Sequence, residues 1–463
     1  MNKVIKKIII IFLLSLIFIQ IFTVPFSISQ KNNKDIEIKD DTGFFEVEQK
    51  NDRWMFIDPL GNPFFSTGIC GIRASGNYAP ELGYSPYHEN VIDIYGNESN
   101  WAFETYERLQ TWEFNTIGYG DKYILSKNMP YCLNLGLAGD NWEMGETPDF
   151  FSKEWEQHVE EKCMIKVKNH SEDRYLIGYF LDNEIRWGTD WRSLLDLFDT
   201  YMQFPSDSPG KNFLVEFLIN KYKDNITSFN TAWKTHLKSF NQILDKKIIG
   251  IWPYTKKARD DHINFTGLVA EKFFKTCHEK IRNYDKNHLI LGTRFQSVTT
   301  PKSVVEASSA YVDVVSINHY PTWPFMLPLL NIVHNILDFT SQKDYFKEYY
   351  DLTKKPILIS EINFRAYDSG LPNTKPSPFF APVLLTQKQR AFCFKIFMDG
   401  FIEKPYSVGY HWFAHSDQPK TGRFDGENSN VGIVNEKDIP YETLVKTLKE
   451  INIRAQQTVE GYF

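Results

Sequence analysis

Short apolar runs recur along this chain and alternate with segments of helical periodicity. The clearest run is PILISEINF at residues 356–364, where β-branched and leucine side chains follow a proline. Such a run predicts a strand that is buried on both faces, as in a parallel sheet. The eight predicted strands cover residues 64–72, 114–118, 131–138, 177–181, 288–295, 312–320, 356–364 and 408–415.

Strands that alternate with helical patterns favour a parallel sheet closed into a ring, an α/β fold of the (β/α)8 or TIM-barrel type. Residues 44–64 alternate apolar and polar positions around the sequence Asp-Pro-Leu-Gly-Asn at 58–62. This pattern predicts an N-terminal β-hairpin suited to closing the barrel floor. Residues 191–280 have helical periodicity, which predicts an extended helical insertion between the fourth and fifth strands.

The N-terminus has the pattern of an export signal. Three lysines among the first seven residues precede an apolar run at 8–24, and small residues follow it. Residues 1–29 are therefore expected to be a signal peptide or, because the run reaches the lower limit for a membrane span, an N-terminal membrane anchor. A polar linker follows at 30–43, and one domain is expected over 44–463. Either alternative predicts a protein that is secreted or anchored on the outer side of a membrane.

Composition narrows the possible partners. The net charge is −6 and no basic stripe is visible, so we expect no nucleic-acid partner. The five cysteines are scattered without CxxC spacing, which predicts buried free thiols and neither a disulfide framework nor a zinc site. His411 and His415 have a spacing that would suit a metal on a helix, but their surroundings are strand-like and offer no third ligand. The sequence predicts no metal site and no other cofactor.

Two glutamates stand at the ends of predicted strands on opposite sides of the ring. Glu184 follows the fourth strand and Glu361 ends the seventh. A carboxylate buried at such a position costs several kcal/mol unless it opens onto a polar pocket or a partner charge. Two carboxyl groups that flank a bound sugar are what glycosidic bond cleavage requires, one to protonate the leaving oxygen and one to attack. The alternatives are a first-turn helix acid for Glu184 and a strand-end ion pair for Glu361.

Four segments resemble clan A of the glycoside hydrolases, and within it the agarase and β-galactosidase branch most of all. The segments are GYFLDNEIRWG from Gly178, PILISEINF from Pro356, DSGLPNT from Asp368 and GYHWFAHSDQPKTGRFDGENSNVG from Gly409. The resemblance extends from about residue 44 to the C-terminus. It implies that residues 44–463 are a (β/α)8 catalytic domain with a retaining mechanism.

The resemblance implies roles for individual residues. Glu184 would be the acid/base, Glu361 the nucleophile, and Asn183 the contact to the sugar 2-hydroxyl. Tyr320 matches the tyrosine that hydrogen-bonds the nucleophile and keeps it ionised. The alternatives are a helix N-cap for Asn183 and an aromatic side chain packed under a loop for Tyr320.

Further substrate contacts are expected from strands six and eight. Asn318 and His319 are candidates for sugar hydroxyls, although strand alternation puts Asn318 on the face of Tyr320 and His319 on the other. Trp412 is expected to be the stacking floor beneath the reacting sugar, with a core residue as the alternative. Four tryptophans in βα loops are candidates for further sugar subsites or for packing: Trp142, Trp187, Trp191 and Trp323.

One position departs from the clan pattern. Many members place an arginine after strand two to support the nucleophile, but this chain has Gly-Tyr-Gly-Asp-Lys at 118–122. Arg73 after strand one and Arg294 after strand five are the candidate substitutes.

The residues and the resemblance together predict a retaining glycosidase that cleaves β-glycosidic bonds in galactose-containing oligo- or polysaccharides such as agar. Two alternatives stay open. One is a transglycosylase that uses the same site, and the other is a non-catalytic surface barrel that binds glycans.

Overall fold

The computed structural model describes residues 43–139, 141–142, 144–250, 254–321, 344–374 and 383–463. The chain forms two compact units, Met1–Asp40 and Asp41–Phe463, and every described residue belongs to the second. The predicted N-terminal segment at 1–29, all but the last residue of the predicted linker, and Trp323 lie outside the described residues.

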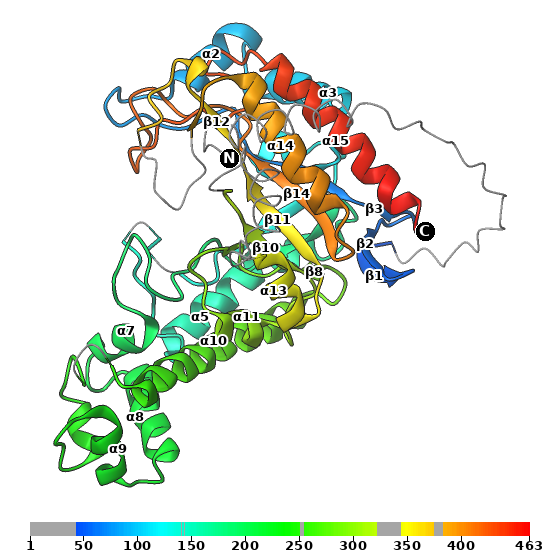
Figure 1. The fold of residues 1–463 in the computed structure, drawn as a ribbon. Helices are drawn as coiled ribbons and strands as arrows, with labels where there is room; N and C mark the ends of the chain where they lie inside the picture. The colour runs from blue at the N-terminus through cyan, green and yellow to red at the C-terminus, as the bar shows by residue number, and fades with distance from the viewer. Residues whose placement is uncertain (1–42, 140, 143, 251–253, 322–343, 375–382) are drawn as a thin grey trace, which may run out of the picture. The chain divides into compact units, whose positions relative to one another are not determined.

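A curled parallel sheet forms the centre of this unit (Figure 1). Within the described residues its strand order is β8 (Leu289–Ile290), β7 (Leu176–Phe180), β6 (Tyr131–Asn134), β5 (Thr116–Gly120), β4 (Ser66–Ile72), β14 (Ser407–Phe413), β11 (Ile357–Ile362), β10 (Val315–Asn318) and β9 (Phe295–Gln296). Each of the eight predicted strand segments overlaps at least one of these strands. Strands β7 and β11 are buried along their whole length, as their unbroken apolar runs predict for a sheet covered on both faces.

The two edges of this sheet belong to one short stretch of chain. β8 pairs with β7 and β9 pairs with β10, yet only residues 291–294 separate β8 from β9. The nine strands therefore come from eight chain segments, and these segments are arranged around the sheet in their order along the chain. This arrangement is consistent with a TIM-type barrel. We call residues 289–296 the seam.

A separate antiparallel sheet precedes the barrel strands. It consists of β1 (Glu46–Lys50), β2 (Arg53–Ile57) and β3 (Pro63–Phe64). The tight turn between β1 and β2 is at Asn51 and Asp52, whose φ angles are 50° and 62°. The predicted Pro-Leu-Gly-Asn turn joins β2 to β3 instead, so the segment contains two turns rather than one.

Side chains of this small sheet, with Phe45 just before it, join a buried cluster whose barrel members lie mostly near the start of the strands, although Phe180 ends β7. Phe45, Phe56 and Phe64 belong to one buried cluster. Its barrel members are Cys132, Ile177, Phe180, Leu289, Leu291, Val314, Leu358 and Val408. The small sheet thus packs against the strands at the end opposite to the ends where polar side chains such as Glu361 lie.

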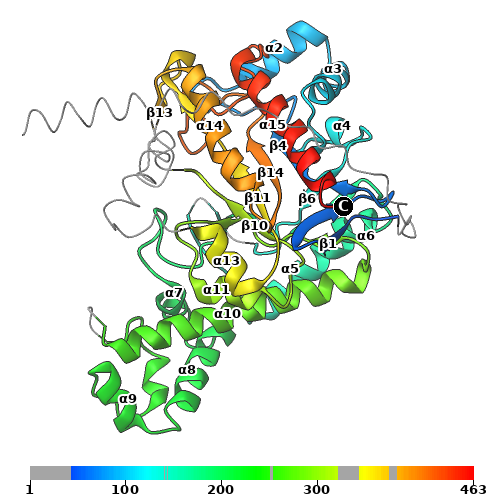
Figure 2. The same cartoon turned by 45° about the vertical axis from the view of Figure 1, so that its right-hand side comes forward.

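Helices surround the barrel strands. Between strands they are α2 (Pro86–Tyr95), α3 (Glu98–Thr111), α4 (Lys122–Leu125), α5 (Lys153–Lys162) with the π-helical turn η1 (Cys163–Val167) and α6 (Lys168–His170), α11 (Lys302–Ser308), α13 (Tyr345–Thr353), the 3-10 turn η3 (Tyr367–Ser369), α14 (Gln387–Ile402) and the final α15 (Glu442–Glu460). The short parallel pair β12 (Arg365–Ala366) and β13 (Val383–Leu384) precedes α14. In Figure 1 and Figure 2, α14 and α15 lie side by side next to β14.

The predicted helical insertion lies between β7 and β8. It consists of α7 (Leu197–Gln203), α8 (Pro209–Lys221), α9 (Ile226–Trp233), the 3-10 turn η2 (Phe240–Ile243) and the long α10 (Lys256–Tyr284). Helices α7, α8 and α9 all pack against α10, and α10 also packs against α5 and α11 beside the barrel (Figure 2). The insertion is therefore built on one helix that belongs to the barrel wall.

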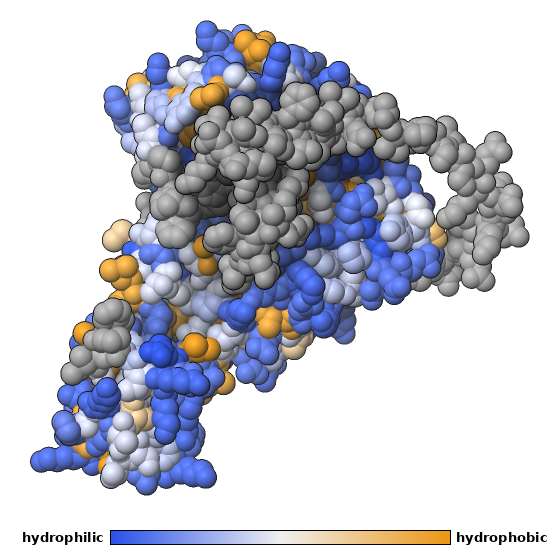
Figure 3. Space-filling model, viewed as in Figure 1, coloured by the Kyte–Doolittle hydropathy of each residue, from blue (hydrophilic) through white to orange (hydrophobic). Residues whose placement is uncertain are grey.

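The five cysteines are buried and unpaired, as the sequence predicts. On the face shown in Figure 3, hydrophobic side chains are scattered among hydrophilic ones. In the part of the chain that the structure describes, none of the helices has the length and apolar character needed to cross a membrane.

Candidate active site

A cavity of about 1170 Å³ opens at the carboxyl ends of the parallel strands. Its lining includes Tyr119 from β5, Asn134 from β6, Glu184 from the loop after β7, and Glu361 from β11. This end of a parallel barrel is where polar side chains can face a ligand instead of the core. The structure therefore brings together the two glutamates that are 177 positions apart in the sequence (361 − 184).

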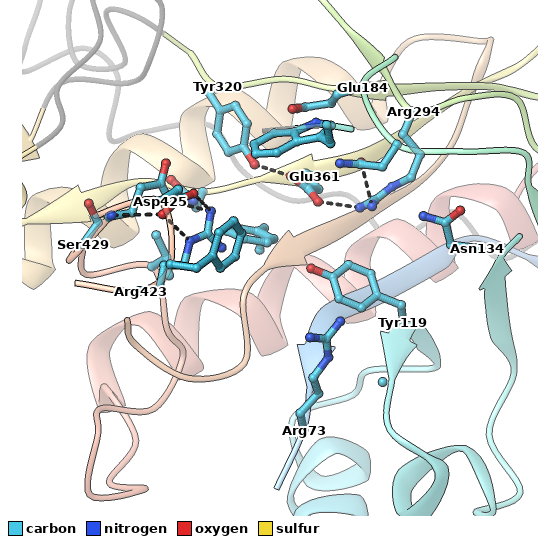
Figure 4. Close-up of a pocket in the computed structure, with 18 of the residues that line it drawn as sticks. Arg73, Tyr119, Asn134, Glu184, Arg294, Tyr320, Glu361, Arg423, Asp425 and Ser429 are labelled. Carbon is cyan, nitrogen blue, oxygen red and sulfur yellow. Dashed lines mark hydrogen bonds and ion pairs between the residues drawn. The ribbon is translucent and has the colours of Figure 1, made fainter. Parts of the chain in front are cut away.

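Glu361 is buried and held by two donors from different strands. Nη2 of Arg294 donates to Oε1 at 2.6 Å, and the hydroxyl of Tyr320 donates to Oε2 (Figure 4). Burial first, and then the negative charges of Glu361 and Glu184, raise the pKa of Tyr320 well above its usual value. The phenol therefore stays protonated and remains a donor. Both contacts favour the carboxylate form of Glu361.

Arg294 is the arginine that supports the predicted nucleophile. It lies in the seam with φ 52°, and its guanidinium also donates to the Ser360 carbonyl at 3.1 Å and to Asn183 Oδ1 at 2.9 Å. Burial opposes the charge of this guanidinium, but Glu361 and its other neighbours raise its pKa above the usual value. Of the two candidates from the sequence, Arg294 makes the contact, whereas Arg73 lines the cavity over the ring of Tyr119.

Glu184 has a different environment from Glu361. Its side chain is buried, and Asn318 Nδ2 donates to its Oε1 at 3.0 Å. Burial first, and then the negative charge of Glu361, raise the pKa of Glu184 to about 7. A carboxyl group with this pKa carries its proton over part of the neutral range, whereas Glu361 accepts from a positively charged guanidinium and a phenol.

Asn183 and Asn318 connect the two glutamates. Asn318 Nδ2 also donates to Asn183 Oδ1 at 3.1 Å, and the hydroxyl of Ser360 donates to Asn318 Oδ1 at 2.8 Å. The Arg294 guanidinium can only donate, so the Asn183 atom that faces it is the amide oxygen, and the Asn318 group beside that oxygen is its amide nitrogen. Asn183 Oδ1 accepts from both Arg294 and Asn318. One network thus runs from Glu361 through Arg294, Asn183 and Asn318 to Glu184.

An aromatic pair lies in the cavity beside Glu184. Trp142 and Trp191 line it with ring centroids 6.4 Å apart. The Arg192 guanidinium lies 5.2 Å from the Trp142 ring and 4.7 Å from the Trp191 ring, and its Nη2 donates to the Glu184 carbonyl at 2.9 Å. These two tryptophans line the cavity and stay candidates for sugar subsites, whereas Trp187 is buried against Phe274 with rings stacked at 5.7 Å.

The loop after β14 forms another wall of the cavity. Arg423, Asp425, Glu427 and Ser429 all line it. Arg423 pairs with Asp425 and Glu427, each at 2.8 Å. These residues lie in the segment GRFDGENSN, which is part of the resemblance to clan A glycoside hydrolases. No individual role was predicted for any of them.

Two predicted substrate contacts do not reach the cavity. Trp412 is fully buried, its Nε1 donates to the Val431 carbonyl at 2.9 Å, and its ring meets Phe394 edge-on at 5.0 Å, so it is the core residue of the alternative prediction. The next residue, Phe413, lines the cavity instead.

His319 points away from Asn318 and Tyr320, as strand alternation requires. It stacks on Phe397 at 5.4 Å and its Nδ1 is 3.1 Å from the hydroxyl of Ser297, while burial lowers its pKa to about 4. It is therefore a neutral packing residue between the strand and the helices, outside the cavity lining.

The site also contains residues that the sequence did not single out. Arg192, Ser360 and Asn134 had no motif or spacing that flagged them. Ser360 belongs to β11 and Asn134 ends β6, whereas Arg192 lies in the segment after β7. Their positions in the site depend on the closed barrel, so a signal for them was not present in the local sequence.

Comparisons with known proteins place this geometry among carbohydrate-active enzymes. No family model matches the chain. The chain is 27% identical over 486 residues to β-agarase B of Vibrio sp. (strain JT0107), which covers 89% of the chain and 48% of that protein. It is also 27% identical over 476 residues to β-agarase A of the same organism, covering 88% of the chain and 45% of that protein. The chain thus spans about half the length of the curated relatives it matches.

Solved structures show the same fold. PfGH50B matches with a TM-score of 0.77 and 24% identity over 92% of this chain and 68% of that chain. An exo-β-agarase matches with a TM-score of 0.74 and 25% identity, and the match covers 91% of this chain and 66% of that chain. The agarase AgWH50C matches with a TM-score of 0.72 and 24% identity, and the match covers 90% of this chain and 66% of that chain. In sequence and in fold, the chain is therefore similar to the agarase-like branch of the glycoside hydrolases.

Proposed function

We propose that this protein is a retaining glycoside hydrolase that cleaves β-glycosidic bonds in agarose or a related galactose-containing glycan. The observation that carries the proposal is the pair Glu184 and Glu361, which line one cavity in different environments: burial and a neighbouring negative charge raise the pKa of Glu184 to about 7, whereas Glu361 is paired with Arg294. Two carboxyl groups divided in this way are what double displacement requires. The similarity to β-agarases supports a galactan as the substrate.

In the first step, Glu361 attacks the anomeric carbon while Glu184 protonates the leaving oxygen. The glycosidic C–O bond breaks, a glycosyl ester forms on Glu361, and the aglycone leaves with the proton of Glu184. Arg294 and Tyr320 orient the Glu361 carboxylate for attack. Near neutral pH the raised pKa of Glu184 keeps part of the population in the acid form.

In the second step, Glu184 acts as the base. It takes a proton from water, the water oxygen attacks the anomeric carbon, and the ester to Glu361 breaks, which releases the sugar with its original configuration. Removal of the negative charge of Glu361 in the ester lowers the pKa of Glu184, because that charge is one cause of its rise. Glu184 then ionises more readily at the stage where a base is needed.

The N-terminal segment fits this proposal. A polymeric galactan is met outside the cell, and the export pattern at 1–29 would deliver the enzyme there. Intact-mass measurement of protein recovered from the culture medium would identify a cleaved segment, whereas recovery only with membranes would favour the anchor.

The chemical test uses agarose with three variants. We expect the wild type to release oligosaccharides from agarose, Glu361→Gln to lose turnover by at least about 10⁴-fold, and Glu184→Ala to regain activity on an activated aryl β-galactoside when azide is added. The retained configuration would be read from the anomeric proton signals of the first product. Glu146→Gln, an exposed acid outside the cavity lining, is the matched control and should behave like the wild type.

Turnover that survives both glutamate substitutions would overturn the proposal. So would inversion of the anomeric configuration, because it excludes a covalent intermediate on Glu361. Binding of agarose oligosaccharides without any cleavage by the wild type would favour a glycan-binding barrel.

A further inference from the structure

Arg73 is a cation of the cavity without a counter-charge. It follows β4, its side chain is exposed, and it lines the cavity, where Figure 4 shows it pointing toward Tyr119. Among the described residues, no carboxylate forms an ion pair with it. Other arginines of the cavity do have such partners: Arg294 pairs with Glu361 at 2.6 Å, Arg192 with Asp190 at 2.6 Å, and Arg423 with Asp425 at 2.8 Å.

The acid that contacts the backbone next to Arg73 is Asp121, and it is occupied by other donors. Asp121 accepts the backbone N–H groups of Tyr123 and Ile124 at its Oδ1 and that of Ala74 at its Oδ2. The carboxylate thus caps α4 and fixes the backbone beside Arg73, while the Arg73 side chain extends into the cavity.

Tyr119 holds Arg73 in place beside the catalytic glutamates. The Arg73 guanidinium lies 5.4 Å from the Tyr119 ring centroid, and the Arg294 guanidinium lies 5.2 Å from the same centroid. Two positive charges therefore share one aromatic ring. The charge of Arg294 is balanced by Glu361, so an anion bound at Arg73 would relieve the remaining excess of positive charge.

We propose that Arg73 forms a subsite for an anionic substituent on the glycan, a sulfate ester or a carboxylate, and that the preferred substrate is an acidic galactan. The inference rests on the proposed glycosidase function and names its substrate class. A neutral glycan that covers Arg73 removes water from the guanidinium without supplying a charge, which is unfavourable. A sulfate or carboxylate oxygen pair matches the planar guanidinium and forms charge-assisted hydrogen bonds with it.

The activity test compares matched oligosaccharides of agar type that are neutral, sulfated or carboxylated. We expect the wild type to have a higher kcat/KM on one of the anionic substrates than on the neutral one. In Arg73→Gln the anionic-to-neutral ratio of kcat/KM should fall by about tenfold or more, and Arg73→Lys should restore part of it. Comparison of the two anionic substrates distinguishes a sulfate from a carboxylate.

Lys122→Gln is the matched control. Lys122 is an exposed cation at the same end of the barrel, 5.0 Å from the Tyr123 ring, and it lies outside the cavity lining. Its substitution removes the same formal charge, so a general effect of net charge would appear in both variants, whereas a specific subsite affects Arg73→Gln alone. Added salt should also lower the anionic-to-neutral ratio of the wild type more than that of Arg73→Gln.

A binding measurement separates this inference from the proposed function. Titration calorimetry with Glu361→Gln should show tighter binding of an anionic oligosaccharide than of the neutral one, and the difference should disappear in Glu361→Gln/Arg73→Gln. The inference would be overturned if agarose is cleaved and the anionic-to-neutral ratio of kcat/KM is equal in the wild type, Arg73→Gln and Lys122→Gln. That result would leave the glycosidase proposal intact. If the wild type binds the anionic oligosaccharide more tightly than the neutral one but cleaves no substrate, the glycosidase proposal is overturned and the anion subsite at Arg73 remains.

Discussion

At the scale of single residues, the environment of each glutamate decides its chemical state. Glu361 accepts from a guanidinium and a phenol, whereas the side chain of Glu184 accepts from the Asn318 amide in a buried position. A formal positive charge within hydrogen-bond distance stabilises a carboxylate far more than one neutral amide does. Of the two glutamates, Glu184 has a pKa raised to about 7, while Glu361 is paired with a guanidinium and a phenol.

The first prediction concerns the pH dependence of kcat/KM. Because Glu184 must carry its proton in the first step and its pKa is raised to about 7, kcat/KM should fall as the pH rises through about 7. The Asn318 amide lowers this pKa by stabilising the carboxylate, so Asn318→Ala should move the alkaline limb to higher pH while lowering the maximum rate.

Asn134→Ala is the control for this prediction. Asn134 lines the cavity, but no hydrogen bond connects it to Glu184 among the described residues. Its variant should keep the alkaline limb of the wild type even if KM changes. A limb that stays in place in Asn318→Ala, measured over pH 5 to 9 with a fixed buffer ionic strength, would contradict the assignment of that pKa to Glu184.

Residue positions were predictable from the sequence where a motif fixed the side chain relative to a strand end. Glu184, Glu361, Asn183, Asn318 and Tyr320 all belong to the connected network or contact it. Trp412 and His319 were misplaced for one reason. A strand residue changes face with each step, and the sequence alone does not fix where the strand ends and the loop begins.

At the scale of elements, the loop after β14 depends on one buried acid. Asp417 Oδ1 accepts from Asn430 Nδ2 at 2.9 Å and from the Gly432 backbone at 2.8 Å, and its Oδ2 accepts from the Tyr441 hydroxyl at 2.6 Å. Burial raises the pKa of Asp417 to about 6. These contacts tie both ends of the segment that presents Arg423 to the cavity.

The second prediction is that Asp417→Ala loosens this loop. Three buried donors would lose their acceptor, which should lower the free energy of unfolding by about 2–4 kcal/mol and raise KM for the glycan. Urea unfolding and initial-rate kinetics measure the two effects. Asp58→Ala removes a carboxylate that accepts the backbone N–H groups of Leu60 and Asn62 at the other end of the barrel, so it should leave KM unchanged.

A loss of stability in Asp417→Ala with no rise in KM would mean that the loop does not contribute to substrate binding. The contacts of Asp417 were not foreseeable from the sequence, because its partners lie 13, 15 and 24 residues further along the chain. Local patterns predict strands and helices, whereas such loop contacts depend on the closed barrel.

At the scale of the whole described unit, stability and chemistry lie at opposite ends of the strands. Phe56 is fully buried in the cluster that joins the small antiparallel sheet to the start of the barrel strands. The two glutamates lie near the other ends of those strands. The eight strand segments could be read from the sequence because each is a compact apolar run, but the turn at Asn51 and Asp52 was missed because neither residue is a glycine.

The third prediction follows from this separation. Phe56→Ala should lower the free energy of unfolding by about 3–5 kcal/mol, because it leaves a cavity among packed side chains. Wherever the variant remains folded, its kcat and KM should match those of the wild type. Denaturant titration and steady-state kinetics at the same temperature test both statements, and a reduced kcat in fully folded protein would show that the two ends are coupled.

The seam at residues 289–296 limits where this chain can be cut and rejoined. Within it, Arg294 carries the counter-charge of Glu361, and the backbone N–H of Arg294 donates to Ser316 Oγ at 2.9 Å, which anchors the seam to the neighbouring strand. New termini placed at the seam of a circular permutant would loosen the hydrogen bond from Arg294 to Ser316. They would also break the continuous chain between β8 and β9 that closes the ring of strands. Termini placed between α8 and α9 would spare both, so the helical insertion is the better site for engineering a two-piece enzyme.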